Sequence, residues 1–158
     1  MDDRISRERM TIQPLADHPI AIPILAKWFF HEWRQFDGRA LPQIERQLRE
    51  NLRHALIPIT FLALRNAELI GTVSLDLSDL PPHDHLSPWL ASLYVTPACR
   101  HRGVGRALVE HLMAFARAKQ VPIIFLWTPG STAPTGSAHR CRLEPEHRMS
   151  TLHRGRPR

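Results

Sequence analysis

Five residues between positions 100 and 106 have the types and spacing that bind an anion: Arg100, Arg102, Gly103, Gly105 and Arg106. They stand between an apolar run and an amphipathic helical pattern. The first turn of a helix has N–H groups without intrahelical acceptors, and these groups and the helix dipole attract anions. Glycine lets a ligand approach the backbone closely, and arginine adds charge-assisted hydrogen bonds. The stretch therefore predicts a site for a phosphate or pyrophosphate group.

The common nucleotide-binding motifs do not fit this stretch. A Walker A loop requires Gly-Lys-Ser or Gly-Lys-Thr, and neither occurs in the sequence. A dinucleotide-binding Gly-x-Gly-x-x-Gly pattern also fails, because Leu108 stands where the third glycine would be. Taken alone, the stretch could also be a solvated basic turn with no ligand.

Acid–base chemistry has its own candidates at the end of a predicted strand and in the loop after it: Asp76, His83, Asp84 and His85. Each could take a proton directly or through a water molecule. A solvated loop residue is the more ordinary interpretation of each. The two histidines could hold a metal, but without further ligands at a suitable spacing they do not predict a metal site, and the sequence identifies no catalytic residue.

The helices and strands that must position these residues follow from hydrophobic periodicity. We expect strands at 11–15, 57–65, 69–77, 89–95 and 122–128 and helices at 22–36, 41–54 and 103–119. The last two strands flank the last helix, and a strand, a helix and a strand in that order form a βαβ unit. Strands 89–95 and 122–128 should therefore be parallel, which makes the fold class α/β.

Length and composition narrow the class of protein. A chain of 158 residues fits one domain with a substantial core. The cysteines, Cys99 and Cys141, do not make a disulfide framework, so we expect a cytoplasmic protein. The charged N-terminus does not resemble a secretory signal, and the apolar runs are far shorter than the ~20 residues of a membrane helix. The net charge of +6 favours anionic partners.

The sequence from about residue 11 to 129 resembles the GNAT family of N-acetyltransferases. Arg100, Gly103 and Gly105 match the family pattern Arg/Gln-x-x-Gly-x-Gly/Ala, and the preceding "LYVTPACR" resembles the family's fourth strand and its exit into the loop. The stretches "LSPWLASLYV" and "WFFHEW" resemble a bacterial subgroup. The resemblance implies a mixed sheet with flanking helices.

The resemblance also implies a binding site for acetyl-CoA, with no metal. The loop amides of Arg102, Gly103, Val104, Gly105 and Arg106 would hold the pyrophosphate, with Arg100 and His101 before them and Ala107 at the helix start. The main chain of Leu93, Tyr94 and Val95 would pair with the pantetheine arm in a gap between the fourth and fifth strands. Backbone donors on the fourth strand would polarise the thioester carbonyl, and an amine would attack it directly.

For several further residues, this resemblance and their position in the sequence predict a role. Glu32 and Asp37 stand near the end of the first helix, on the acceptor side in this family, and could attract a cationic amine. The stripe of Trp28, Phe29 and Trp33 is expected in the core or in the wall of an acceptor pocket. For Tyr94, the only tyrosine in the chain, we expect packing or a cofactor contact. A packing role is expected for Cys99.

The resemblance ends near Gly130. Family members continue with a helix that often carries a tyrosine able to protonate the departing thiolate, and then with two more strands. Residues 130–158 instead carry six arginines and two glutamates, with no Ile, Val, Phe, Trp or Tyr. We trace no period there and expect a basic tail without regular structure, produced by a frameshift or a truncated gene or present naturally. The loss would expose an edge of strand 122–128, which a homodimer could cover.

The sequence thus favours an acetyl-CoA-dependent N-acetyltransferase with a domain at 1–129 and a tail at 130–158. The acceptor would be a small-molecule or protein amine, with no membrane partner. A CoA-binding protein without turnover remains open, because the C-terminal part of the fold is atypical. A nucleic-acid-binding module is a third interpretation, which the basic tail favours and its lack of aromatic residues disfavours.

Overall fold

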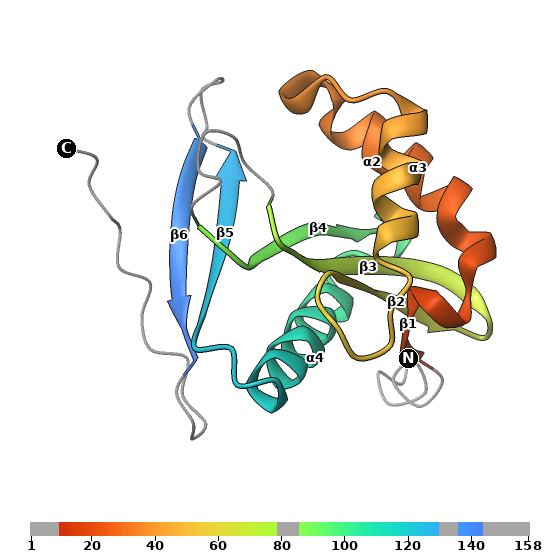
Figure 1. Ribbon diagram of the computed structural model, residues 1–158. Helices are drawn as coiled ribbons and strands as arrows, with labels where there is room; N and C mark the ends of the chain where they lie inside the picture. Colours follow the sequence, from red (N-terminus) through yellow and green to blue (C-terminus); the bar gives the residue numbers. More distant parts are fainter. Residues whose placement is uncertain (1–9, 79–85, 130–135, 144–158) are drawn as a thin grey trace.

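The sheet runs in chain order from β1 to β6 within residues 10–78, 86–129 and 136–143, the parts of the chain that the computed structural model describes (Figure 1). Its strands are β1 Met10–Pro14, β2 Ile59–Arg65, β3 Glu68–Asp76, β4 Trp89–Val95, β5 Ile123–Pro129 and β6 Gly136–Arg142. Neighbouring strands are antiparallel except β4 and β5, which are parallel. The parallel pair and the mixed α/β sheet confirm the sequence prediction.

Helices cover both faces of this sheet. The helices α2 Ile22–Asp37 and α3 Leu41–Glu50 lie on one face, and α4 Val104–Ala118 lies on the other (Figure 1). The helix predicted at 41–54 ends at Glu50, because the side chain of Asn51 turns inward to buried hydrogen-bond partners. Within the described residues, none of the helices combines the length and the apolar character that crossing a membrane requires.

Each helical layer forms its own core against the sheet. On the α4 face, buried residues of the helix pack with alternate residues of β2 and β3: Leu108, Leu112, Ala116, Ile59, Phe61, Val73 and Leu75. On the other face, α2 and α3 pack with the intervening positions of β2: Leu25, Phe29, Ile44, Leu48, Leu62 and Leu64. The period of two along the strands therefore decides which layer each side chain joins.

A glycine of β3 sets how closely α4 approaches the sheet. A Cβ atom at Gly71 would lie 3.0 Å from the carbonyl oxygen of Tyr94 and 3.1 Å from Cδ1 of Leu108. Both distances are shorter than an ordinary carbon contact, so a larger residue would push both β4 and the first turns of α4 away from β3. The position of the helix N-terminus relative to β4 thus depends on this glycine.

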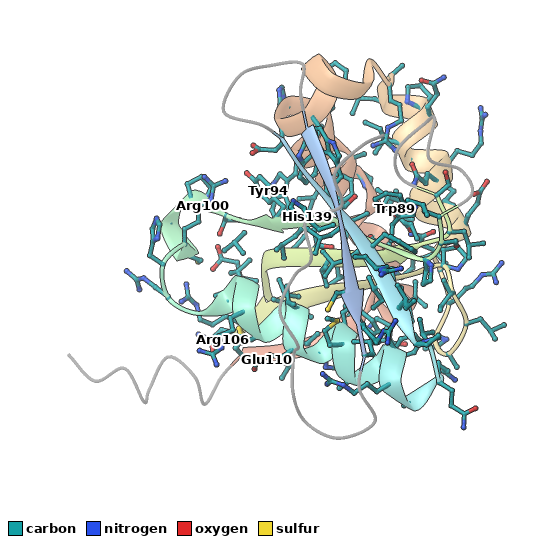
Figure 2. All side chains as sticks on the ribbon, turned by 90° about the vertical axis from the view of Figure 1, so that its left-hand side faces the viewer. Trp89, Tyr94, Arg100, Arg106, Glu110 and His139 are labelled. Carbon is teal, nitrogen blue, oxygen red and sulfur yellow. The ribbon has the colours of Figure 1, made fainter. Side chains whose placement is uncertain are left out.

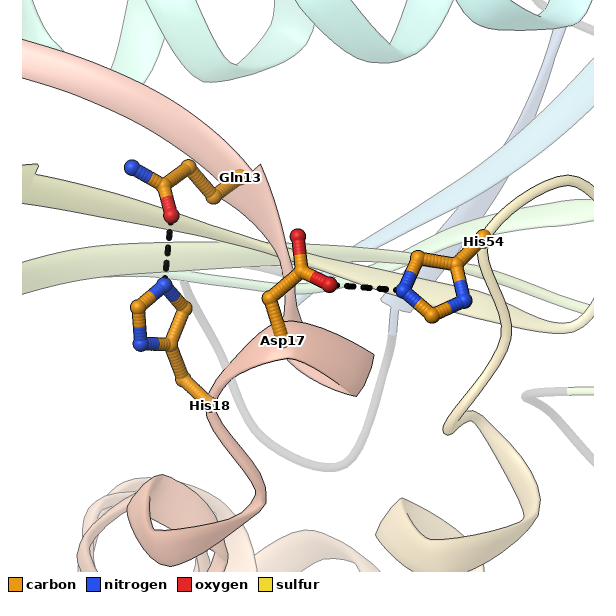
Figure 3. A network of polar contacts seen from close by, with 4 residues as sticks. All are labelled: Gln13, Asp17, His18 and His54. Atoms are coloured by element: carbon orange, nitrogen blue, oxygen red, sulfur yellow. Dashed lines mark hydrogen bonds and ion pairs between the residues drawn. The ribbon is translucent and has the colours of Figure 1, made fainter.

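Side-chain hydrogen bonds fix the connections near the start of the fold (Figure 3). His54, in the segment between α3 and β2, lies with its Nε2 atom 2.6 Å from Oδ1 of Asp17 in the short helix η1 Leu15–Asp17. His18 contacts the side-chain oxygen of Gln13 in the same way. These contacts hold the chain where it passes from β1 into α2.

The strand β6 corrects the prediction for part of the tail. Residues 136–142 pair with the whole length of β5 in antiparallel register, from Ile123 opposite Arg142 to Pro129 opposite Gly136. Coil was expected because apolar residues are scarce there, but Cys141 and the following Leu143 are buried while Arg142 is exposed. This alternation is a strand period that the composition concealed.

The expectation that β5 has an exposed edge is therefore also wrong, because β6 covers it. The rest of the predicted tail, residues 130–135 and 144–158, lies outside the described residues. The domain boundary at 129 and the homodimer stay predictions.

Candidate functional site

The strands β4 and β5 are joined only at one end. Trp89 pairs with Phe125 and Leu90 with Leu126, and no further pair follows within the described residues. Beyond Leu90, β4 stays paired with β3 while β5 runs away from it, so that the two strands form a V in Figure 1. Main-chain groups of β4 that point away from β3 therefore face a gap rather than a strand.

A bulge lies in β4 where this gap opens. Ala91 pairs with Ser74 and Tyr94 with Thr72, so Ser92 and Leu93 together oppose a single residue of β3. Ser92 has a φ of 55°, in the left-handed region that residues other than glycine seldom adopt. A bulge leaves main-chain groups unpaired and re-aims the side chains around it. Strain of this kind is often found at functional sites.

The N-terminus of α4 opens on the same edge of β4. Gly103 is the N-cap residue with a φ of 83°, and His101 has a φ of 61°. The N–H of Ala107 donates to the carbonyl of Gly103 at 3.0 Å, so the N–H groups of residues 103–106 precede the first intrahelical bond. A Cβ at Gly105 would meet only Cγ2 of Val95, at 3.7 Å. The turn therefore presents bare backbone donors.

The arginines of this turn take different positions (Figure 2). Arg106 pairs with Glu110 one turn along α4, with 2.8 Å between Nε and Oε1, and both side chains are exposed. The Nε of Arg100 donates to the carbonyl of Val95 at 2.9 Å. Its guanidinium carbon lies 5.4 Å from the centre of the Tyr94 ring. Arg100 therefore ties the turn to the end of β4, while Arg102 and Arg106 lie toward solvent.

Tyr94 points from β4 toward α2 and packs there. Its ring centre lies 4.9 Å from that of Trp28 and 6.4 Å from that of Trp33. Of the two roles that the sequence predicts for this tyrosine, packing is confirmed, and a cofactor contact stays a prediction. Trp28 and Trp33 border the same core as expected. Phe29 is buried within it.

A buried polar group lies on the α2 and α3 side of the sheet. The side-chain nitrogen of Asn51 donates to Oδ1 of Asp76 at 2.7 Å and to the hydroxyl of Thr60 at 3.0 Å. The hydroxyls of Thr60 and Ser74 are 2.7 Å apart. Beside this group is a small cavity lined by Phe29, Arg39, Ile44, Gln47, Leu48, Asn51, Ser74, Asp76 and Ser92. The cavity thus reaches from the helices to the bulge of β4.

Only some of the remaining candidate residues from the sequence analysis lie in the described part of the structure. Cys99 is buried, and Arg65 donates to its sulfur at 3.2 Å, in keeping with a packing role. Glu32 is exposed on α2. The side chain of Asp37 and the loop residues His83, Asp84 and His85 lie outside the described residues. Within the described part of the chain, no group of three or more His, Cys, Asp or Glu residues could hold a metal.

Sequence reasoning missed Asn51, Thr60 and Ser92. A signal existed for part of the polar group, because Thr72, Ser74 and Asp76 alternate with Val73 and Leu75 along β3. The same alternation that identified the apolar face of this strand places polar side chains on the opposite, equally buried face. For Ser92 there was no signal, because a bulge depends on the pairing of two strands.

Comparison with known proteins finds a family and solved structures to which this chain is similar. Residues 22–141 match the acetyltransferase (GNAT) family, whereas a search of curated proteins gave no match. An acetyltransferase of the GNAT family from Staphylococcus aureus Mu50 superposes with a TM-score of 0.56 at 17% identity, over 75% of this chain and 72% of that chain.

Two solved structures similar to this chain contain a CoA ligand. An aminoglycoside 6'-N-acetyltransferase complexed with coenzyme A has a TM-score of 0.58 at 18% identity, over 75% of this chain and 61% of its own length. A predicted acetyltransferase from Clostridium acetobutylicum with acetyl-CoA has a TM-score of 0.53 at 18% identity, over 74% of this chain and 79% of that chain. At such low identity these likenesses show the fold alone.

Proposed function

Because the chain belongs to the acetyltransferase (GNAT) family, we propose that it transfers an acetyl group from acetyl-CoA to a primary amine. The observation that carries this proposal is the separation of β4 from β5 beside the exposed N-terminus of α4. A strand edge and a set of helix N–H groups at one gap suit a ligand with an amide-containing arm and a pyrophosphate.

The chemistry of the donor groups fits such a ligand. The N–H groups of residues 102–106 would bind the pyrophosphate oxygens, because an anion replaces the acceptors that the first turn lacks. Gly103 supplies the left-handed turn, and Gly105 leaves the surface of the turn without a side chain. The exposed Arg102 and His101 would add positive charge or donors from the rim.

The main chain of β4 would hold the pantetheine arm. Leu93 and Val95 alternate with Tyr94, which pairs with Thr72 of β3, so their amides are directed to the gap. The carbonyl of Val95 already accepts a bond from Arg100, which leaves its second lone pair for the arm. Arg100 would act through this contact, by keeping the turn and the strand edge in register.

Acetyl-CoA would supply an acetyl group activated as a thioester. The donors left unpaired by the bulge at Ser92 and Leu93 would stabilise the negative charge that develops on the thioester oxygen. Preorganised backbone donors need no reorganisation as the charge develops, and the loss of one such donor typically costs about 10²–10³ in rate. The chain would therefore catalyse direct transfer by position and by electrostatics.

Calorimetric titration with acetyl-CoA, followed by detection of free CoA in the presence of amines, tests the proposal. We expect acetyl-CoA to bind and the amine to cause CoA release. Binding without release would select a CoA-binding protein without turnover. This alternative draws support from the sequence, because the only tyrosine, Tyr94, lies in β4 and packs on Trp28, and no tyrosine follows β5. No binding at all would contradict both functions.

A further inference from the structure

We propose that Arg65 is a positioning residue for the proposed pyrophosphate site, because its guanidinium holds Cys99 and with it the segment that leads from β4 to the N-terminus of α4. The inference rests on the proposed binding of acetyl-CoA. It assigns a role in that binding to a residue of β2, which lies far from the turn in the sequence and acts through Cys99.

The segment between β4 and α4 contains the short helix η3 Pro97–Cys99, which lies on the fold through the side chain of Cys99. This side chain is only 4% exposed and belongs to the core on the α4 face, whereas the other two residues of η3 are exposed. Just before η3, the N–H of Thr96 donates to the carbonyl of Ile70 in β3 at 2.9 Å. The position of η3 therefore depends on what surrounds the sulfur of Cys99.

Arg65 makes a polar contact with that sulfur. It is the last residue of β2 and follows Phe61 and Ala63 on the face that α4 covers. The Nη2 atom of the half-buried Arg65 donates to Sγ of Cys99 at 3.2 Å. Sulfur is a weak acceptor, but a charged donor strengthens the bond. The contact therefore ties the end of β2 to the residue that precedes Arg100.

The Arg65 side chain lies toward Cys99 although a carboxylate stands opposite it. Glu68 pairs with Arg65 in the hairpin between β2 and β3 and is exposed. Residues directly opposite each other in antiparallel strands share a face. Both residues belong to the described part of the chain, and no ion pair joins them there. An exposed ion pair would contribute little to stability, whereas the contact with the buried Cys99 fixes a segment of the chain.

The turn between η3 and α4 needs support from both of its ends. His101 has a φ of 61°, and a residue other than glycine keeps such a conformation only where the surrounding structure holds it. At the α4 end, Gly71 sets how closely the helix approaches β3. At the η3 end, Arg65 holds Cys99. Loss of the Arg65 contact should therefore let the turn relax and displace the N–H groups that would bind the pyrophosphate.

The first test removes each partner of the contact. Arg65→Met keeps an unbranched side chain without charge or donor, and Cys99→Ala removes the acceptor. Calorimetric titration with acetyl-CoA, well below the unfolding temperature, measures the affinity. We expect each variant to bind about 10-fold more weakly, the order that the loss of one hydrogen bond from a charged donor corresponds to. C99A changes no charge, so its loss cannot come from weaker long-range attraction.

The double variant shows whether the two residues act as a pair. When either partner is absent the contact is already lost, so R65M combined with C99A should bind acetyl-CoA about as well as R65M alone. Independent effects of the two residues would instead multiply. This comparison concerns the affinity of the folded protein, which a general loss of stability does not change.

The third test restores the acceptor. Cys99→Ser has an oxygen to which Arg65 can donate, so its affinity for acetyl-CoA should be closer to that of the wild type than to that of C99A. If only the volume of the sulfur mattered, C99S and C99A would bind equally weakly. Both variants leave β2 unchanged, so they test the contact even if R65M does not fold.

The matched control is Glu68→Met, which places the same side chain as R65M at the opposite, exposed position of the hairpin. E68M removes a charge without touching Cys99, and its affinity for acetyl-CoA should not fall. Wild-type affinity in R65M or C99A, losses that multiply in the double variant, equal losses in C99S and C99A, or a loss in E68M as large as in R65M would overturn the role of Arg65. Absence of acetyl-CoA binding by the wild type would instead remove the proposed function on which the inference rests.

Discussion

At Gly105, helix stability favours a residue with a side chain, whereas the close approach of the proposed ligand favours glycine. In the first turn of a helix a side chain would be tolerated, since the space beside its Cβ position holds only Val95 at an ordinary contact distance. The helix itself would gain from a residue with less backbone freedom. A glycine at position 105 therefore favours a ligand that approaches the backbone more than it favours the stability of the fold.

Gly105→Leu should accordingly separate binding from stability. We expect the affinity for acetyl-CoA to fall by at least about 10-fold, because a side chain would stand between the N–H groups and the pyrophosphate. The thermal unfolding midpoint should not fall. Ala114→Leu places the same side chain at an exposed position of α4 and serves as the control for calorimetry and melting. Unchanged affinity in Gly105→Leu would show that the pyrophosphate lies elsewhere.

The packing of His111 against the core changes the pKa of its side chain. Its ring meets that of Phe61 edge to face at 4.7 Å, and desolvation by burial lowers the pKa of this histidine below its usual value. The unfolded chain then binds a proton at a higher pH than the folded protein does. The neutral ring therefore contributes its full stability when the pH is above the pKa that His111 has in the unfolded chain. This contribution is lost as the pH falls from that value toward the lower pKa that His111 has in the folded protein.

We therefore expect acidification from pH 8 to pH 5 to lower the melting temperature of the wild type more than that of His111→Gln. Glutamine keeps a polar side chain of similar length but does not titrate. Differential scanning calorimetry at several pH values measures the difference, and other histidines cancel in the comparison. An identical pH dependence of the two proteins would mean that His111 is solvated in solution.

At the scale of elements, α4 is a core helix whose N-terminus is also the proposed binding site for the pyrophosphate. Gly71 of β3 determines how near β4 and the first turns of α4 come to β3, because a Cβ there would lie 3.0 Å from the carbonyl oxygen of Tyr94 and 3.1 Å from Cδ1 of Leu108. The contact with Tyr94 involves backbone, which cannot rotate away as a flexible side chain can.

Gly71→Ala is therefore predicted to act on both stability and binding. We expect a loss of about 1–3 kcal/mol in the free energy of unfolding, the usual range for overpacking a core. The affinity for acetyl-CoA should fall as well, since the N-terminus of α4 moves relative to β4. Urea unfolding and calorimetry measure the two effects. Ala63→Gly, which removes a methyl group from the partner position in β2, should lower stability while leaving the affinity unchanged.

The elements show which features a sequence can predict. The helix faces containing Leu108 and Leu112 or Ile44 and Leu48, and the parallel pair of strands, follow from local periodicity, which one segment displays by itself. Glycine and arginine types at fixed spacing single out the turn at residues 100–106, for which anion binding stays a prediction. Ser92 and Asn51 act through partners that are distant in the chain, so their roles depend on strand register and on helix docking, which no single segment reveals.

At the scale of the whole molecule, β6 protects the edge of the sheet that β5 would otherwise expose. It covers β5, and the side chains of Cys141 in β6 and of Leu143 directly after it join the core on the α4 face. Burial also raises the pKa of the Cys141 thiol, although Arg117 acts in the opposite direction. The core of α4 and β5 is therefore completed by residues from a segment whose composition suggested a tail.

Leu143→Asp should show how much the fold depends on this segment. A carboxylate introduced into the core must be desolvated without a partner, so we expect a loss of at least about 2–4 kcal/mol in the free energy of unfolding, as for other buried unpaired charges. Arg142→Asp makes the same new residue on the exposed face of β6 and should change stability by less than about 0.5 kcal/mol. Urea unfolding followed by tryptophan fluorescence compares the two variants. If both unfold at the wild-type urea concentration, β6 is not part of the cooperative unit, and the sheet that carries the proposed site ends at β5.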